Sequence, residues 1–276
     1  MTSYIDTHAH YFISKFDNLD GGAAALLDSP DFRATVRGVI NVGISLESSR
    51  KAVEQAARYP FMVAAVGIHP EAAQGIPDGT PLDPDRALAE LRAWVSDADA
   101  RRRDKIVAIG EMGLDYYWEP MDKPLQKVFF EGQLAMAAEL GLPAIIHDRE
   151  AHGDCFDIVC RYPSVRGVFH AYSGSAEMAR DLVRRGWYIA FGGPVTYKNA
   201  ERTRAAAAAV PMDRLLLETD CPYLTPVPHR GKINHSGHIP YIAEVIADLH
   251  GITVEEVAEI TAKNAENLFG LSNFIG

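Results

Sequence analysis

The stretch IVAIGEMGLD, residues 106–115, is an almost continuous run of apolar residues that ends in polar ones. A strand with one face in water alternates apolar and polar residues, whereas a strand that is buried on both faces reads as an unbroken apolar run. Unbroken runs of this kind are typical of parallel sheets. The stretch therefore predicts a buried parallel strand that carries polar groups toward its carboxyl end.

Seven further runs of this kind are spread along the chain. They are YIDTHAH (4–10), GVINVG (38–43), MVAAVGIHP (62–70), PAIIHDR (143–149), GVFHAYSG (167–174), WYIAFGG (187–193) and LLLETDCP (215–222). Between them lie segments of helix-forming residues with an apolar stripe, at 46–59, 124–141, 175–186 and 199–210. Alternation of strands and helices predicts an α/β fold, a (β/α)8 TIM barrel with C-terminal helices, as one domain over residues 1–276.

Local signals place several element ends. Gly141 and Gly186 stand where a glycine commonly ends a helix. Residues 238–270 predict two more helices, with Thr253 as an N-cap and Glu256 as its capping-box partner. Residues 71–86 are rich in Pro, Gly and Asp and predict a loop over one end of the barrel. An open doubly wound sheet is the competing fold, but no G-x-G-x-x-G follows an early strand, so dinucleotide binding has no support.

Composition limits the classes of function. The chain has 276 residues, of which 47% are hydrophobic and 23% charged, as in ordinary globular proteins. No apolar run reaches the length of a membrane span, and the start lacks the pattern of a signal peptide. The three cysteines, Cys155, Cys160 and Cys221, form no C-x-x-C pair, so a reducing cytoplasm is the expected location. No obligate protein partner is indicated.

The formal net charge of −10 argues against a non-specific nucleic-acid binder, which usually has a basic face. It does not exclude an enzyme that acts on nucleic acid. Bound divalent cations would make the active site locally positive whatever the overall charge.

Polar residues of the metal-binding types end most of the apolar runs. His8 and His10 stand two residues apart in an expected strand, so both side chains project from the same face. In a barrel the carboxyl ends of all strands meet at one face, which brings distant residues together. The convergent set is His8, His10, Glu111, His147, His170 and Asp220. Four imidazoles and two carboxylates are enough for two divalent cations, with Glu111 as the bridge because its glycine neighbours allow close backbone approach.

Several motifs in this order resemble the TatD family of metal-dependent hydrolases, also called TatD deoxyribonucleases, of the amidohydrolase superfamily. They are D-x-H-x-H (6–10), G-x-H-P (67–70), G-E-M-G-L-D-Y (110–116), H-D-R (147–149), F-H-A-Y-S-G (169–174), E-T-D-C-P-Y-L (218–224) and P-H-R-G-K-x-N (228–234). The resemblance implies that one ion is held by His8, His10, Glu111 and Asp220, and a second by Glu111, His147 and His170. It also implies cleavage of DNA with Mg²⁺ or Mn²⁺, while Zn²⁺ is a possible alternative.

The chain departs from the family pattern in two loops. Ala171-Tyr172 replaces a cysteine-phenylalanine pair, and Asn234-His235-Ser236 replaces asparagine-glutamate-proline, which also leaves His238 without a counterpart. Both loops are expected to line the substrate pocket, so the departures bear on substrate choice.

The expected chemistry is attack of a metal-activated water on phosphorus. Asp220 would accept the proton of this water, and Glu111 would hold both ions. Candidates for substrate binding are His69, Arg149, Arg230 and Lys232, although each of the three cations could instead form a surface salt bridge. His69 could donate a hydrogen bond to phosphate or protonate the leaving group.

Weaker signals leave two interpretations open. Tyr116, Tyr117 and Trp118 could stack a nucleobase or pack as the core of a loop. Asp6 and Asp115 could each orient a histidine or serve a turn, and Cys221 is expected to be a small buried residue rather than a nucleophile.

The first hypothesis, as the resemblance implies, is a 3′–5′ exonuclease that acts on DNA, and a narrow pocket at a barrel mouth suits a strand end. The alternative is an amidohydrolase-type enzyme for a small molecule, such as a lactone, an amide or a phosphoester, because fold alone does not fix function. A binding protein without turnover is disfavoured by the complete set of six ligands.

Overall fold

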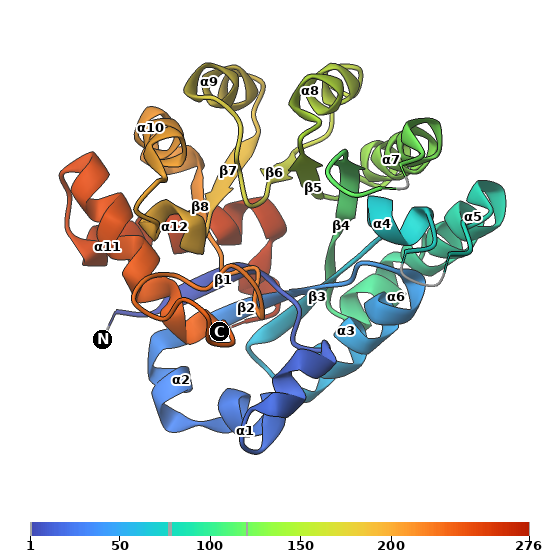
Figure 1. Ribbon diagram of the computed structural model, residues 1–276. Coiled ribbons are helices and arrows are strands. Elements are labelled where there is room, and N and C mark those ends of the chain that lie inside the picture. The colour runs from blue at the N-terminus through green and yellow to red at the C-terminus, as the bar shows by residue number, and fades with distance from the viewer. Residues whose placement is uncertain (1, 77–78, 120, 276) are drawn as a thin grey trace.

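The computed structural model describes residues 2–76, 79–119 and 121–275. Eight parallel strands follow one another around a central sheet in their sequence order (Figure 1). The strands are β1 (Tyr4–Ala9), β2 (Val36–Val42), β3 (Met62–Val66), β4 (Ile106–Asp115), β5 (Ala144–Arg149), β6 (Gly167–Phe169), β7 (Tyr188–Phe191) and β8 (Leu215–Leu217). The first strand also contacts the segment beyond the last, where the backbone N–H of His10 donates to the carbonyl of Cys221 at 2.9 Å. The sheet thus forms a nearly closed barrel, and the expected TIM-barrel fold is confirmed.

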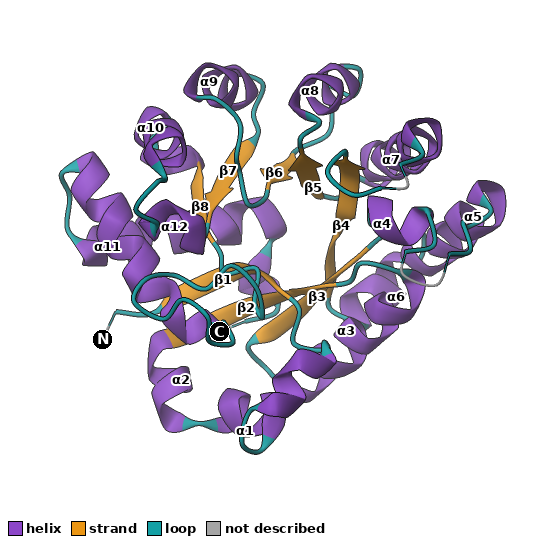
Figure 2. Ribbon diagram, viewed as in Figure 1, coloured by secondary structure: helices purple, strands orange, loops and turns teal. Residues whose placement is uncertain are grey.

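Helices surround the strands and cover the outer face of the barrel (Figure 2). They are α1 (Gly22–Asp28), α2 (Pro30–Thr35), α3 (Leu46–Arg58), α4 (Pro70–Ala73), α5 (Pro84–Val95), α6 (Ala98–Arg103), α7 (Lys123–Leu140), α8 (His152–Cys160), α9 (Ala176–Arg184), α10 (Glu201–Ala209), α11 (Ile239–His250) and α12 (Val254–Phe269). Among the described residues, none of the helices is long and apolar enough to cross a membrane.

The strands are buried as the apolar runs predict. Every residue of β4 is buried, and the side chains of this strand belong to two apolar clusters. One lies between the sheet and the helices, and includes Ile109, Phe130 and Leu134. The strands β6 and β8 are shorter than their apolar runs, because the polar ends of those runs lie beyond the strands at the carboxyl side of the barrel.

Helix ends follow the capping signals closely. Gly141 takes the left-handed conformation directly after α7, and the side chains and backbones of Thr253 and Glu256 form a reciprocal capping box at α12. Gly186 follows α9 by two residues and has a φ of +93°. A residue with a Cβ atom rarely adopts such positive φ values, which explains the glycines.

The expected loop at 71–86 is partly wrong. Helix α4 reaches Ala73, and α5 begins at Pro84 with the side chain of Asp83 accepting a hydrogen bond from the backbone of Arg86. Proline at the first helical position and an aspartate N-cap are start signals that the loop-like composition obscured. Residues 77–78 of this stretch lie outside the described residues.

Candidate metal centre

Six side chains of the types that bind metals converge at the carboxyl side of the barrel, as the sequence predicts. His8, Glu111 and His147 belong to β1, β4 and β5. His10 and His170 directly follow β1 and β6, and Asp220 lies three residues beyond the end of β8. Four of the six side chains are no more than 5% exposed, and the other two, His147 and Asp220, are half-buried. These donors therefore lie together at one end of the barrel, although their role as ligands stays a prediction.

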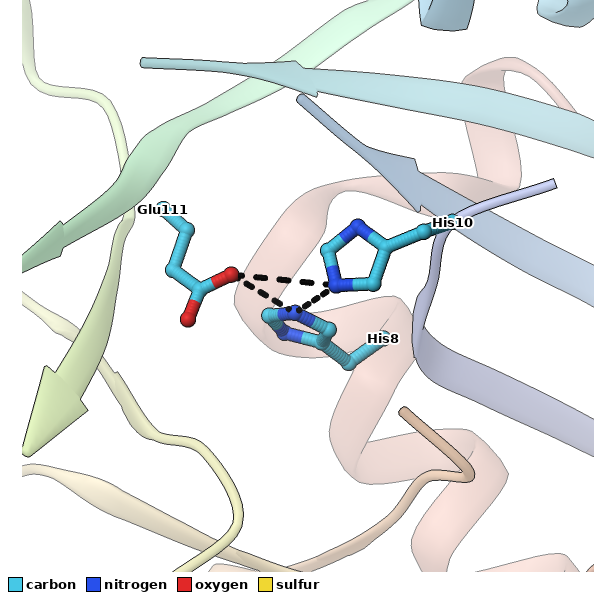
Figure 3. A group of neighbouring side chains, drawn as sticks. All are labelled: His8, His10 and Glu111. Atoms are coloured by element: carbon cyan, nitrogen blue, oxygen red, sulfur yellow. Dashed lines mark hydrogen bonds and ion pairs between the residues drawn. The ribbon is translucent and has the colours of Figure 1, made fainter. Parts of the chain in front are cut away.

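One oxygen of the Glu111 carboxylate faces His8 of β1 and His10, which directly follows that strand (Figure 3). Glu111 Oε2 lies 3.1 Å from His8 Nε2 and 3.8 Å from His10 Nε2, and the two nitrogens are 3.2 Å apart. Asp220 Oδ1 lies 3.2 Å from His10 Nε2. This half of the centre has the four donors expected for one ion.

The other oxygen of Glu111 faces the second pair of histidines. Glu111 Oε1 lies 2.8 Å from His147 Nδ1 and 2.7 Å from His170 Nε2. His8, His170 and Asp220 also form a group whose donor atoms are within 4.8 Å of one another, so the two halves are contiguous. A single carboxylate between two donor sets is the arrangement that bridges a pair of cations.

The tautomers of two histidines fit metal binding. His10 Nδ1 lies 2.6 Å from the carbonyl oxygen of Val42, and His147 Nε2 lies 3.0 Å from Asp115 Oδ2. In the neutral ring, each contact places the proton on the nitrogen that points away from the centre, which leaves a lone pair on the nitrogen that points into it. Lone pairs and carboxylate oxygens packed this closely are satisfied by a cation, so the donor set fits divalent metal.

The backbone around Glu111 is packed as tightly as its glycine neighbours suggest. A Cβ atom placed on Gly67 would lie 2.6 Å from the carbonyl carbon of Gly110, so β3 and β4 approach closely there.

Burial alone would raise the pKa of Glu111, but the surrounding imidazoles hold this pKa well below its usual value. Glu111 is therefore ionised at neutral pH.

His69 also reaches the centre, but with a different tautomer. Its Nδ1 accepts a hydrogen bond from the backbone of Glu71 at 3.1 Å, so its proton lies on Nε2, which is 3.6 Å from Glu111 Oε1. Burial and nearby His147 lower the pKa of His69 to about 3. A neutral ring with an N–H directed toward the centre can donate a hydrogen bond to a substrate oxygen but is a poor general acid.

The candidate phosphate-binding cations differ in position. Arg149 ends β5, two residues beyond His147, and its guanidinium lies 3.8 Å from the ring centre of Tyr117. Arg230 stacks on Tyr197 at 3.9 Å, and Lys232 is exposed. Within the described residues, no ion pair involves any of these three cations, so the salt-bridge interpretation finds no support there.

Sequence reasoning missed the role of Asp6. Its carboxylate accepts hydrogen bonds from the Thr219 hydroxyl at 2.5 Å, the Ser236 hydroxyl at 2.6 Å and the Thr219 backbone at 3.0 Å. Asp6 therefore connects β1 to the segment that carries Asp220 rather than orienting an imidazole. The sequence indicates that Asp6 lies on the same strand face as His8, but the hydrogen-bond partners of Asp6 lie more than 200 residues away along the chain.

Two buried glutamines on α7 were also missed. Gln133 hydrogen-bonds both the N–H and the carbonyl of Ile68, and Gln126 does the same for Asp115. These contacts fix the backbone beside His69 and beside the carboxylate that holds His147. The signal available in the sequence was their spacing of seven residues on an otherwise apolar helix face.

The two departures from the family pattern lie in different environments. Tyr172 is buried in the core, where its hydroxyl donates to the carbonyl of Ser175, so the expectation that it lines the pocket is wrong. Asn234 is buried too, and its amide donates to the carbonyls of Thr219 and Tyr223 on either side of Asp220. The second loop therefore supports the segment that carries Asp220.

Three histidines stack in this second loop. The ring of His238 lies 3.9 Å from that of His235 and 4.5 Å from that of His229. Burial, the two neighbouring imidazoles and Lys232 lower the pKa of His238 to about 3, so the folded chain favours its neutral form.

Replacing His238 should weaken the effect of acid on stability. The unfolded chain binds a proton at this position below about pH 6.5 and the folded chain does not, so stability falls as the pH falls from 6.5 toward 3. Relative to wild type, His238→Gln should lose about 1–2 kcal/mol less stability between pH 7.5 and pH 5. Urea unfolding of both proteins at both pH values measures this difference. Equal losses in the two proteins would contradict the expected role of this ring.

Comparisons with known proteins agree with the geometry. A family model described as "TatD related DNase" matches residues 5–270. The "uncharacterized metal-dependent hydrolase YabD" of Bacillus subtilis is 39% identical over 97% of this chain and 99% of its own length. The "uncharacterized metal-dependent hydrolase TatD" of Mycobacterium tuberculosis is 33% identical over 97% and 98%. The crystal structure of the TatD homologue YJJV from Escherichia coli superposes with a TM-score of 0.83 at 30% identity, covering 97% of this chain and 98% of that one.

Proposed function

Because this chain belongs to the TatD family of metal-dependent hydrolases, we propose that it is a deoxyribonuclease that removes nucleotides from the 3′ ends of DNA strands. The observation that carries the proposal is the position of Glu111, whose two carboxylate oxygens face two separate sets of imidazoles. Cations held by these donors would supply stabilisation of the attacking and the leaving oxygen in an in-line displacement at phosphorus. We propose Mg²⁺ or Mn²⁺ as the ions in function.

The residues divide the chemistry among them. Cations held by the six donors would supply Lewis-acid polarisation of the phosphoryl group and a lower pKa for the attacking water. Asp220 is ionised, since its contact with His10 lowers its pKa against the effect of burial, and its carboxylate accepts the proton that the water loses. His69 donates its Nε2–H to a phosphoryl oxygen. Arg149, Arg230 and Lys232 hold the flanking phosphates.

A cleavage assay tests this function. Metal-loaded protein is incubated with single-stranded DNA labelled at its 5′ end, and the products are followed over time with Mg²⁺, Mn²⁺ or Zn²⁺. The expected result is a ladder that shortens from the 3′ end and disappears with chelator. If DNA is not cleaved with any of the three metals while a lactone or a small phosphoester is hydrolysed, the small-molecule alternative replaces this proposal.

A further inference from the structure

Large apolar side chains are exposed almost exclusively around the carboxyl side of the barrel. Within the described residues, the exposed large apolar side chains are Tyr117, Trp118, Val128, Tyr223 and Val227. All but Val128, on α7, lie in the loops that follow β4 and β8, beside the metal centre. Aromatic side chains exposed to water at an active-site rim indicate a partner with flat apolar groups.

The carboxylate of Asp115 connects the backbone of Tyr117, beside Trp118, to His147 of the candidate metal centre. Asp115 Oδ1 accepts the backbone N–H of Tyr117 at 2.9 Å, while Asp115 Oδ2 contacts His147 Nε2 at 3.0 Å. Tyr117 is 53% exposed and Trp118 is 48% exposed. In contrast, Tyr116 is held in the loop by its hydroxyl bond to Asp154 and by Lys123 over its ring. The first two rings are therefore open to solvent in the loop after β4, whereas the third serves loop packing.

A cation completes this surface. The Arg149 guanidinium lies 3.8 Å from the ring centre of Tyr117 and 5.4 Å from that of Trp118. Arg149 and His147 are two residues apart on β5, so their side chains leave the same strand face about 7 Å apart. Arg149, and with it the two rings that its guanidinium contacts, therefore lies on the same side of β5 as His147.

Resting on the nuclease function proposed above, we infer that Tyr117, Trp118 and Arg149 form a stacking platform for an unpaired nucleobase next to the scissile phosphate. Aromatic and guanidinium planes both stack on bases, and the positive charge suits the adjacent backbone phosphate. Bases within a duplex are already stacked and paired, so the platform selects single strands. A small ester without a flat ring would gain nothing from it.

The test measures binding of DNA to the Asp220→Asn variant with Mg²⁺, because this variant should not degrade the strand during the measurement. Of the three tryptophans, only Trp118 is exposed, whereas Trp94 is partly buried and Trp187 is buried. Stacking of an oligothymidine should therefore quench mainly the fluorescence of Trp118. Trp118→Ala should weaken binding of a dye-labelled oligothymidine about tenfold, as measured by anisotropy. Trp118→Phe is the matched control, since it keeps a stacking ring but removes the indole signal.

A second comparison uses the cleaving protein. Trp118→Ala should lose about tenfold in kcat/KM on a normal single strand and less than about twofold on a strand with an abasic residue at its 3′ end. If Trp118→Ala binds and cleaves a normal strand as well as wild type, the platform is wrong while the nuclease function stands. If wild-type protein cleaves no DNA, yet the quenching and the tenfold loss of binding occur, the nuclease function is wrong and the platform stands.

Discussion

Asp220→Asn should lower kcat by about 10²–10⁴-fold while leaving the fold and most of the bound metal in place. An amide oxygen can still contact a cation, but it cannot take the proton from the attacking water. The backbone should tolerate the change, because Asp220 has a φ of +55° and asparagine adopts this left-handed conformation as readily as aspartate. The N–H of residue 220 would still donate to the carbonyl of His8 at 2.9 Å.

Three measurements together check this result: steady-state rates on single-stranded DNA, metal content after dialysis and thermal unfolding. Asp213→Asn is a matched control, since this exposed carboxylate pairs with Arg214 on the surface before β8 and lies outside the centre. It should behave like wild type in all three. An Asp220→Asn protein that keeps more than about a third of wild-type kcat would show that another group accepts the proton.

The fold could be predicted because each β unit carries its own local signal. The run at 106–115 coincides with β4 residue for residue, since nothing in it competes with an extended, fully buried chain. The run at 62–70 was extended too far, because His69 begins a helix: its Nδ1 accepts the backbone N–H of Glu71 and Pro70 starts α4. Such overlaps between a strand end and an N-cap are settled by tertiary contacts, which local patterns do not contain.

The convergence of the six candidate ligands could be predicted because a barrel brings all carboxyl strand ends to one face. The contacts that surround these six residues could not be predicted. Asp6 finds its partners at Thr219 and Ser236, across the closure of the barrel, and no local pattern encodes such distant pairs. Tyr172 illustrates the opposite error, because a departure from a family motif suggested a pocket residue where the structure has a core residue.

Glu111→Gln should remove both metal and activity, which separates it from Asp220→Asn. The amide group replaces one carboxylate oxygen with an NH₂ that donates hydrogen bonds and cannot coordinate a cation. Whichever way the amide turns, either the His8 and His10 side or the His147 and His170 side faces that NH₂ group. One half of the centre therefore loses its shared ligand, and the negative charge that offsets two cations disappears.

Metal content after dialysis should fall by at least half, and kcat/KM by about 10²–10³-fold, which corresponds to several kcal/mol of lost transition-state stabilisation. Glu71→Gln is a fair comparison, because this half-buried carboxyl of α4 lies next to His69 but is not one of the six donors. It should retain wild-type metal content. Restoring the metal by excess Mn²⁺ should recover only part of the Glu111→Gln activity, since the second cation lacks its bridge. Full recovery, or an unchanged metal content, would mean that Glu111 holds one ion at most and that the centre works without a bridging carboxylate.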